Sequence, residues 1–163
     1  MSESRFNTTT DIRPTLGDFS SIVCFRALVV GVEETLGLRA AMVALKGAGR
    51  RRGEGLVADL GLTGAAPADP TEACRLMNDA LSISGTRLCN VDKIERDGDT
   101  FRVYLSETIC SADEPQGSDR ELSFTFGAIH GAMEAIYGIK LRGKQVGSVL
   151  RGQDYDICEF VER

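Results

Sequence analysis

The sequence predicts an α+β fold, with N-terminal helices packed on a four-stranded antiparallel sheet that is made of two hairpins with a helix between them. Three observations support this prediction. Apolar residues recur at helical spacing through the first half of the chain. Asp97-Gly98 separates two β-like runs, which is a strong hairpin pattern. Two further β-like runs follow a last helical segment, and helices gathered on one side of such a sheet define the class.

Two helices are expected in the first third of the chain. One begins at Phe19 and ends at Leu36, and Asp18 is a plausible cap for it. This helix is apolar over most of its surface, which indicates cover on more than one side. This cover could come from the protein core or from a dimer interface, and the sequence leaves both alternatives open. The second helix is expected over residues 38–60, after the break at Gly37.

The remaining elements alternate between helix and hairpin. Asp69 followed by a proline is typical of a helix start, and this third helix is expected to run to about Ser82. The last helix is expected between Ser118, which forms a capping-box pattern with Glu121, and Gly138. Strands are expected at residues 88–96, 100–108, 141–150 and 155–161.

Composition limits the classes of function. The 163 residues suit one domain over residues 16–163, preceded by a polar, flexible tail over residues 1–15. A net charge of -5 argues against general nucleic-acid binding. The single histidine, His130, excludes catalysis by a histidine pair within one chain. We expect a cytoplasmic protein, because no apolar run can span a bilayer and the N-terminus lacks the pattern of a signal peptide.

Three spaced motifs stand out in the C-terminal half of the chain. Phe124, Gly127 and Gly131 form an aromatic-x-x-Gly-x-x-x-Gly pattern. Gln145, Ser148 and Gly152 occupy the positions of a Glu-x-x-Cys-x-x-x-Gly pattern, whose Glu and Cys are both replaced. Cys158 and Phe160 complete a Cys-x-aromatic pattern, and Gly49, Arg50 and Gly53 match a Gly-Arg-x-x-Gly pattern nearer the N-terminus.

In this order and spacing, the motifs resemble the 4-vinyl reductase domain family, and residues 16–163 are most similar to its cyanobacterial members. That family is related in fold to subunits of the TRAPP tethering complex. The resemblance implies a protein that binds a small hydrophobic ligand, with a tetrapyrrole as one candidate. It also implies a role in photosynthetic-complex assembly, repair or pigment handling, with a peripheral place at the thylakoid membrane. By likeness to the TRAPP subunits, it implies a homodimer through the helix from Phe19 to Leu36.

The candidate ligand-binding residues are Arg50, Phe124, Gly127, His130 and Gly131. The glycines leave room for a flat ligand or, equally, for a tightly packed neighbouring helix. His130 could ligate or hydrogen-bond a tetrapyrrole, although a lone histidine on an apolar helix is more often a satisfied core residue.

Arg50 belongs to a run of three arginines that could hold a carboxylate or a phosphate. More often such a run is a solvated face.

Five cysteines, none of them two residues from another, argue against a disulfide framework. Buried thiols are the simplest interpretation. Cys110 and Cys158, with His130 as a possible third ligand, are weak candidates for metal binding, and no metal is expected.

Three functions remain open at this stage. The first is a non-catalytic binding protein for a small hydrophobic ligand. The second is a dimeric, TRAPP-like scaffold without a ligand. The third and least favoured is a vinyl reductase of chlorophyll biosynthesis, because a reductase needs a hydride source and the sequence has no dinucleotide-binding fingerprint.

Overall fold

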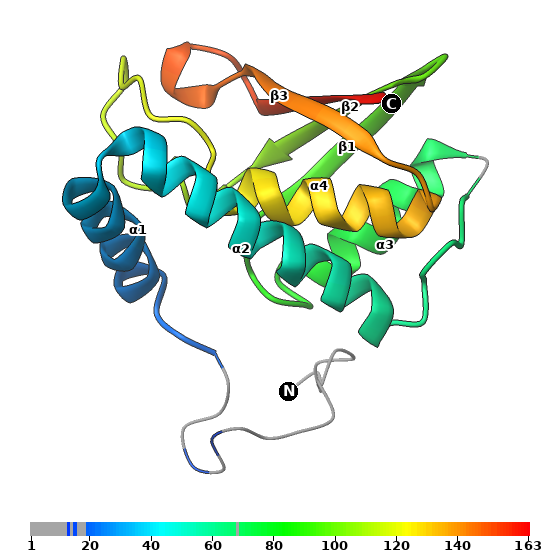
Figure 1. The fold of residues 1–163 in the computed structure, drawn as a ribbon, viewed down its shortest axis with the longest axis horizontal. Helices are drawn as coiled ribbons and strands as arrows, with labels where there is room; N and C mark the ends of the chain where they lie inside the picture. Colours follow the sequence, from blue (N-terminus) through cyan, green and yellow to red (C-terminus); the bar gives the residue numbers. More distant parts are fainter. Residues whose placement is uncertain (1–12, 14, 16–18, 68) are drawn as a thin grey trace.

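The computed structural model describes residues 13, 15, 19–67 and 69–163, so the expected cap at Asp18 and most of the expected tail over residues 1–15 lie outside the described residues. Within the described chain, helices and strands follow one another in the predicted order (Figure 1). The helices are α1 (Ile22–Leu36), α2 (Leu38–Asp59), α3 (Pro70–Leu81) and α4 (Phe124–Tyr137), and the strands are β1 (Asn90–Asp97), β2 (Thr100–Ser106), β3 (Leu141–Gly147) and β4 (Asp156–Glu162). The predicted α+β class is confirmed.

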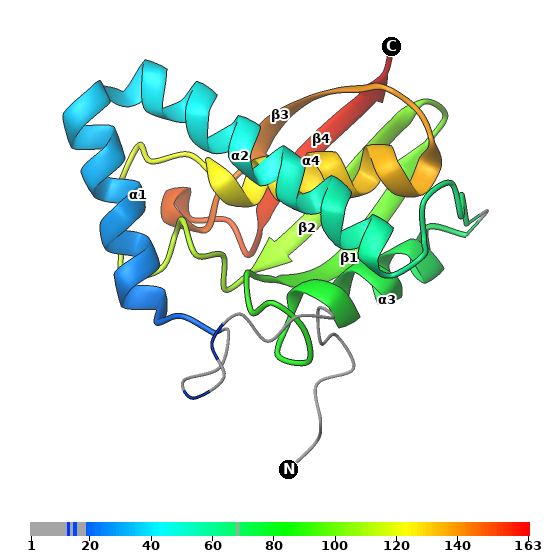
Figure 2. The same ribbon diagram turned by 60° about the horizontal axis from the view of Figure 1, so that its bottom comes forward.

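The sheet has the strand order β1-β2-β4-β3, and every neighbouring pair is antiparallel. The two hairpins therefore meet along β2 and β4, where Phe101 pairs with Phe160 and Val103 with Cys158. These four side chains are buried on the inner face. The helices cover this face, and the opposite face is free of helices in both views (Figures 1 and 2).

The backbones of α2 and α4 lie in direct contact at four glycines, Gly49, Gly53, Gly127 and Gly131, which we call the helix crossing. A Cβ atom at Gly49 would lie 2.1 Å from the carbonyl oxygen of Phe124, and one at Gly53 would lie 2.0 Å from that of Ala128. Gly127 and Gly131 meet the α2 carbonyls of Lys46 and Arg50 in the same way, each at 2.1 Å. No side chain fits between the two helices at these positions, so the crossing requires glycine on both sides.

Helix α1 packs on α2 through a small apolar cluster, and ion pairs tie it to the segment before α4. Of its fifteen residues, all of which are described, Val29 alone is buried. Arg26 pairs with Glu114, and Arg120 pairs with both Glu33 and Glu114, so that four charged side chains tie α1 to the segment that precedes α4. Burial would raise the pKa of Glu114, but hydrogen bonds from both arginines outweigh it and lower that pKa.

One of the expected helix caps is wrong and another is confirmed. The capping box at Ser118 is wrong, because α4 begins at Phe124, and the Ser118 hydroxyl instead accepts a hydrogen bond from the backbone N–H of Arg120. The segment before α4 stays non-helical and buries Leu122 beneath β3 (1% exposed). The cap at Asp69 is confirmed, since its carboxylate accepts from the N–H of Thr71.

The end of the third expected strand also differs. β3 stops at Gly147 rather than continuing to residue 150, because the Ser148 hydroxyl accepts from the N–H of Leu150 and opens a short 3-10 turn. None of the helices in the described part of the chain is both long enough and apolar enough to cross a membrane.

Candidate ligand-binding cavity

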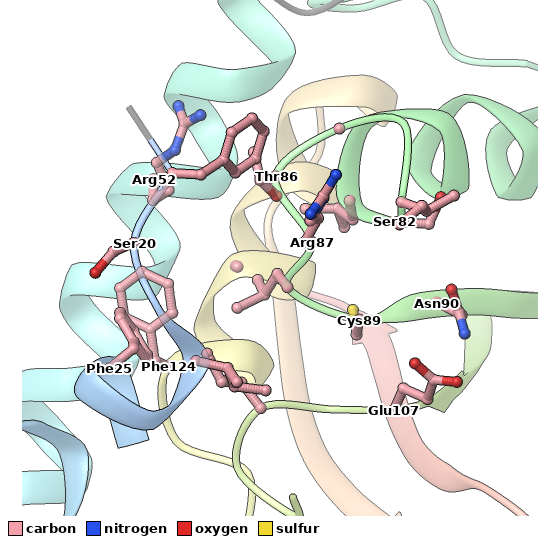
Figure 3. Close-up of a pocket in the computed structure, with 18 of the residues that line it drawn as sticks. Ser20, Phe25, Arg52, Ser82, Thr86, Arg87, Cys89, Asn90, Glu107 and Phe124 are labelled. Atoms are coloured by element: carbon pink, nitrogen blue, oxygen red, sulfur yellow. The ribbon is translucent and has the colours of Figure 1, made fainter. Parts of the chain in front are cut away.

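A cavity of about 790 Å³ lies beside the helix crossing, between the start of α1, the middle of α2, the start of α4 and the loop that joins α3 to β1. We call it the α1 cavity. Figure 3 shows side chains from all of these segments around one hollow. The volume is within the usual range for small-molecule sites.

The wall of the α1 cavity is largely apolar. Phe25 and Phe124 meet edge to face with ring centroids 5.1 Å apart, and they join α1 to α4 at one side of the cavity. The other apolar side chains of the wall are Phe19, Ile22, Leu56, Leu81, Ile83, Leu88, Ile109 and Ala128. Such a surface favours apolar molecules, since removing apolar area from water is the main contribution to binding them.

Polar side chains lie at several places around the wall, and Ser20 and Ser82 are among those labelled in Figure 3. Figure 3 draws Arg52, Thr86 and Arg87 on one side of the hollow, and Asn90 and Glu107 on the other. Arg52 forms an ion pair with Asp59 at 3.7 Å. The guanidinium of Arg87 lies 5.1 Å from the ring centroid of Phe19, a cation–π contact that joins the start of α1 to the α3–β1 loop.

The backbone is strained at two charged positions of this wall. Arg87 has a φ of 56° and Glu107 a φ of 48°, a left-handed conformation that favours glycine or asparagine. Strain of this kind tends to concentrate at functional sites. The α3–β1 loop is tight as well, since a Cβ atom at Gly85 would lie 2.0 Å from the carbonyl oxygen of Ala80.

One thiol, that of Cys89, lies in the wall, and it is 3% exposed. Burial, and to a smaller degree the nearby Cys110, raise the pKa of Cys89 far above the ordinary value of a thiol. The protonated form therefore dominates near neutral pH, and a protonated thiol is a weak nucleophile. The geometry supports a packing role for this cysteine.

The structure separates the candidate ligand residues into three groups. Phe124 lines the α1 cavity. Gly127 and Gly131 belong to the helix crossing, where the neighbouring backbone accounts for both of them without a ligand. Arg50 and His130 lie around a third feature, the carboxylate of Glu134.

Glu134 is a buried acid at 4% exposure with four partners, of which the exposed Lys140 is the most distant, at 3.7 Å. Arg50 pairs with one carboxylate oxygen, and the N–H of Leu141 donates to the other at 2.8 Å. His130 lies 3.5 Å from the same acid. Burial would raise the pKa of Glu134, but the hydrogen bond from Leu141 and the pairing with Arg50 outweigh it, so that its pKa is lowered.

His130 packs against aromatic rings at the end of this cluster. Its Nε2–H donates to the carbonyl oxygen of Leu141 at 3.1 Å, and its ring lies 5.2 Å from that of Phe160 and 5.9 Å from that of Phe126. Burial lowers the pKa of His130 more than the hydrogen bond to Leu141 raises it. The neutral imidazole is thus the favoured form, satisfied by a backbone carbonyl.

Cys110 and Cys158, the weak candidates for metal binding, are both buried. The Cys110 thiol lies 3.5 Å from the Thr125 hydroxyl, and burial raises the pKa of Cys158 well above its ordinary value. Among the residues that the structure describes, no three His, Cys, Asp or Glu side chains are grouped so that they could hold a metal ion.

Gln145 and Ser148, which replace the family's Glu and Cys, make internal hydrogen bonds. The side-chain oxygen of Gln145 accepts from the N–H of Leu122 at 2.8 Å, and its nitrogen donates to the carbonyl oxygen of Gly147 at 2.9 Å. Ser148 caps the 3-10 turn that follows β3. Both side chains therefore support the last hairpin.

Most of the cavity wall could not be found from the sequence. The α3–β1 loop, with Thr86 and Arg87, has no apolar periodicity and no recognisable motif. The sequence gives some indication of Arg52, because it belongs to the run of three arginines that could hold an anion. Phe25 and Leu56 read as ordinary core positions, and only their placement across an open space makes them cavity residues.

No family model matches the sequence, and no curated protein matches it significantly. Solved structures do share its arrangement. The phenol-responsive sensory domain of the transcription activator PoxR, solved with phenol, superposes with a TM-score of 0.65 at 14% identity, over 89% of this chain and 76% of that chain.

Trafficking protein particle complex (TRAPP) subunit 3 from Naegleria fowleri, covalently bound to palmitic acid, superposes with a TM-score of 0.51 at 13% identity, over 88% of this chain and 97% of that chain. A vinyl-4-reductase family protein from Methanocaldococcus jannaschii gives 0.47 at 16% identity, over 91% and 85% of the two chains. At these identities the PoxR and TRAPP likenesses show a shared fold alone. The expected fold relation to TRAPP subunits is confirmed, and the cyanobacterial type stays a prediction.

Proposed function

We propose that this protein is a non-catalytic binding protein that holds a small hydrophobic molecule in the α1 cavity. The observation that carries the proposal is the cavity itself, about 790 Å³ with a largely apolar wall. Two structures of the same fold were solved with small molecules, phenol in one and palmitic acid in the other, and this supports the idea that the fold can accommodate such ligands. A tetrapyrrole, and with it a role in photosynthetic complexes at the thylakoid membrane, stays a candidate on the resemblance alone.

The experiment that tests binding reduces the cavity without touching the helix crossing. Ile109→Trp adds a large side chain to the wall, and Val146→Trp adds the same side chain at an exposed position of β3. Native mass spectrometry and absorption spectra of protein from a pigment-containing host would reveal a co-purifying ligand. We expect a bound ligand in the wild type and the Val146→Trp control, and its loss in Ile109→Trp. Equal binding by both variants, or an empty wild type that binds no added apolar molecule, would contradict the proposal.

A second candidate function, a dimeric scaffold, is favoured by the outer face of α1. Cys24, Leu28 and Gly31 follow one another at helical spacing along this face, and Leu28 is 60% exposed. A Cβ atom at Gly31 would meet nothing within 4 Å, so a neighbouring helix can approach closely there. Further exposed apolar side chains on α1 and the first half of α2 are Ile22, Val23, Leu36, Leu38 and Val43. We propose a second copy of the chain as the cover of this face.

A further inference from the structure

Two arginines, Arg52 and Arg87, lie in the wall of the α1 cavity, and within the described chain neither is held by a close ion pair. Arg87 contacts the ring of Phe19, and no acidic side chain pairs with it among the described residues. Arg52 pairs only with Asp59, at 3.7 Å, and the Asp59 side chain is 55% exposed. An exposed pair at that distance is weak, so Arg52 is free to engage a stronger partner.

Between these arginines the wall offers a hydroxyl that lacks a hydrogen bond. The Oγ1 atom of Thr86 is buried, and it has no hydrogen-bond partner in the described part of the chain. A buried polar atom without a partner is costly and uncommon in folded proteins. Since Thr86 lines the cavity, rotation of its side chain about χ1 would turn this hydroxyl toward a ligand oxygen that accepts the hydrogen bond.

The backbone conformation at Arg87 also supports a role in ligand binding. A left-handed φ of 56° at an arginine costs free energy that a glycine would avoid. The position nevertheless carries a long cationic side chain at the cavity wall. A role for the guanidinium in binding would offset that cost.

From these three observations, and resting on the binding function proposed above, we infer that the ligand is an apolar molecule that carries a carboxylate, which Arg52, Thr86 and Arg87 receive. Guanidinium groups match a carboxylate in charge and geometry, and the Thr86 hydroxyl can donate to one of its oxygens. Glu107 lies on the opposite side of the wall in Figure 3, and its side chain is exposed to solvent. Its negative charge is therefore hydrated and does not face the carboxylate of the ligand. Both a fatty acid and a propionate-bearing tetrapyrrole have this chemistry.

Binding is non-covalent in this proposal. Cys89 is the thiol in the wall, and its protonated, buried state makes it a poor nucleophile. Joining the acid to Cys89 as a thioester would also remove the negative charge that Arg52 and Arg87 are placed to receive. The cationic wall therefore favours a free acid over an acyl-cysteine.

The test compares acids with neutral analogues of the same shape. Purified wild-type protein is titrated with dodecanoate against dodecanol, and with protoporphyrin IX against its dimethyl ester. We expect the acid of at least one pair to bind about tenfold or more tightly than its neutral analogue, as the loss of a charge-assisted hydrogen bond implies. The pair that shows this preference identifies a chain or a macrocycle as the apolar body.

Substitutions then assign the preference to named side chains. Arg52→Gln, Arg87→Gln and Thr86→Val should each weaken the acid by about tenfold and leave the neutral analogue unchanged. Arg39→Gln, which removes an exposed arginine of α2 outside the cavity wall, is the control of equal charge. Arg87→Lys should restore part of the preference.

The outcomes separate the two proposals. Equal affinities for acid and neutral analogue, or an acid preference that survives Arg52→Gln and Arg87→Gln together, would overturn the carboxylate assignment and keep the binding function. No binding of either pair would overturn both. An acyl adduct on Cys89 after incubation with dodecanoyl-coenzyme A, located by peptide mapping, would overturn the non-covalent mode.

Discussion

The helix crossing and the α1 cavity are neighbouring regions of one molecule with opposite packing. At the crossing, the α2 and α4 backbones approach so closely that a single methyl group would collide with a carbonyl oxygen. At the cavity, α1 stands away from the α3–β1 loop and leaves about 790 Å³ between large apolar side chains. Gly53 belongs to both regions. Small residues thus bring the helices together, and large residues with no facing partner border the open space.

The strongest test of this contrast compares alanine at a glycine of the helix crossing with alanine at a glycine of α2 that has open space around it. Gly127→Ala should destabilise the fold by about 3 kcal/mol, because its Cβ would lie 2.1 Å from the Lys46 carbonyl oxygen. Gly47→Ala, also within α2 but with nothing within 4 Å of its Cβ, should stabilise by about 0.5–1 kcal/mol. Urea denaturation of both variants measures the difference. If Gly127→Ala were as stable as the wild type, the backbone contact would be refuted.

A comparable loss is expected from the acid beside the crossing. Glu134→Ala removes the partner of Arg50 and of the Leu141 N–H, and should cost about 3 kcal/mol. Glu54→Ala removes a half-exposed acid 3.6 Å from the same Arg50, and should change stability by no more than about 0.5 kcal/mol. Thermal unfolding of the two variants makes the comparison, and equal losses would show that Glu134 adds nothing beyond a surface pair.

A smaller effect is expected from pH in the same tightly packed region. Burial lowers the pKa of His130 from 6.5, so below that pH the unfolded chain binds a proton that the folded chain resists. Stability that is fully present above pH 6.5 should therefore fall as the pH drops from 6.5 toward the lowered pKa. His130→Gln should flatten this part of the profile. Denaturation between pH 7.5 and 5 checks it, and identical slopes for both proteins would contradict the prediction.

The smallest effect on unfolding is expected on the outer face of α1. Leu28→Glu, at a 60% exposed position, should change the free energy of unfolding of the monomer by no more than about 0.5 kcal/mol. It should nevertheless abolish self-association, which Val146→Glu on β3 should leave intact. Sedimentation velocity at tens of micromolar tests this. A wild type that is monomeric at that concentration would remove the dimeric scaffold from consideration.

The fold was predictable because the sequence patterns that specify its helices and hairpins are local. Asp97-Gly98 specifies one hairpin, Asp69 caps α3, and the apolar spacing of α2 and α4 sets which faces are buried. Ser118 failed as a cap because the burial of Leu122 competes with helix formation there. That competition depends on tertiary contacts, which a local pattern does not contain.

The candidate site was far less predictable, because a cavity forms where segments that are distant in the sequence leave space between them in the fold. Phe124 could be singled out as a ligand residue from its motif, and it lines the cavity. His130 and Arg50 were plausible by chemical type, but Glu134, the acid that engages them, is one helical turn from His130 and 84 residues from Arg50. The convergence of all three therefore depends on the packing of α2 on α4. Arg87 has no distinguishing neighbours in the sequence, and only its strained backbone and its placement mark it.

The presence of Gly53 in both regions has a mechanical consequence for the cavity. The wall that α2 and α4 form is nearly incompressible, since the two backbones are already in contact. Any adjustment to a larger or smaller ligand must then come from the facing wall, where the cation–π contact of Arg87 with Phe19 joins the α3–β1 loop to the start of α1. The cavity can therefore widen only on the side of α1. Ligands of different size should bind in the same position against α2 and α4, and they should differ in how far they displace the start of α1.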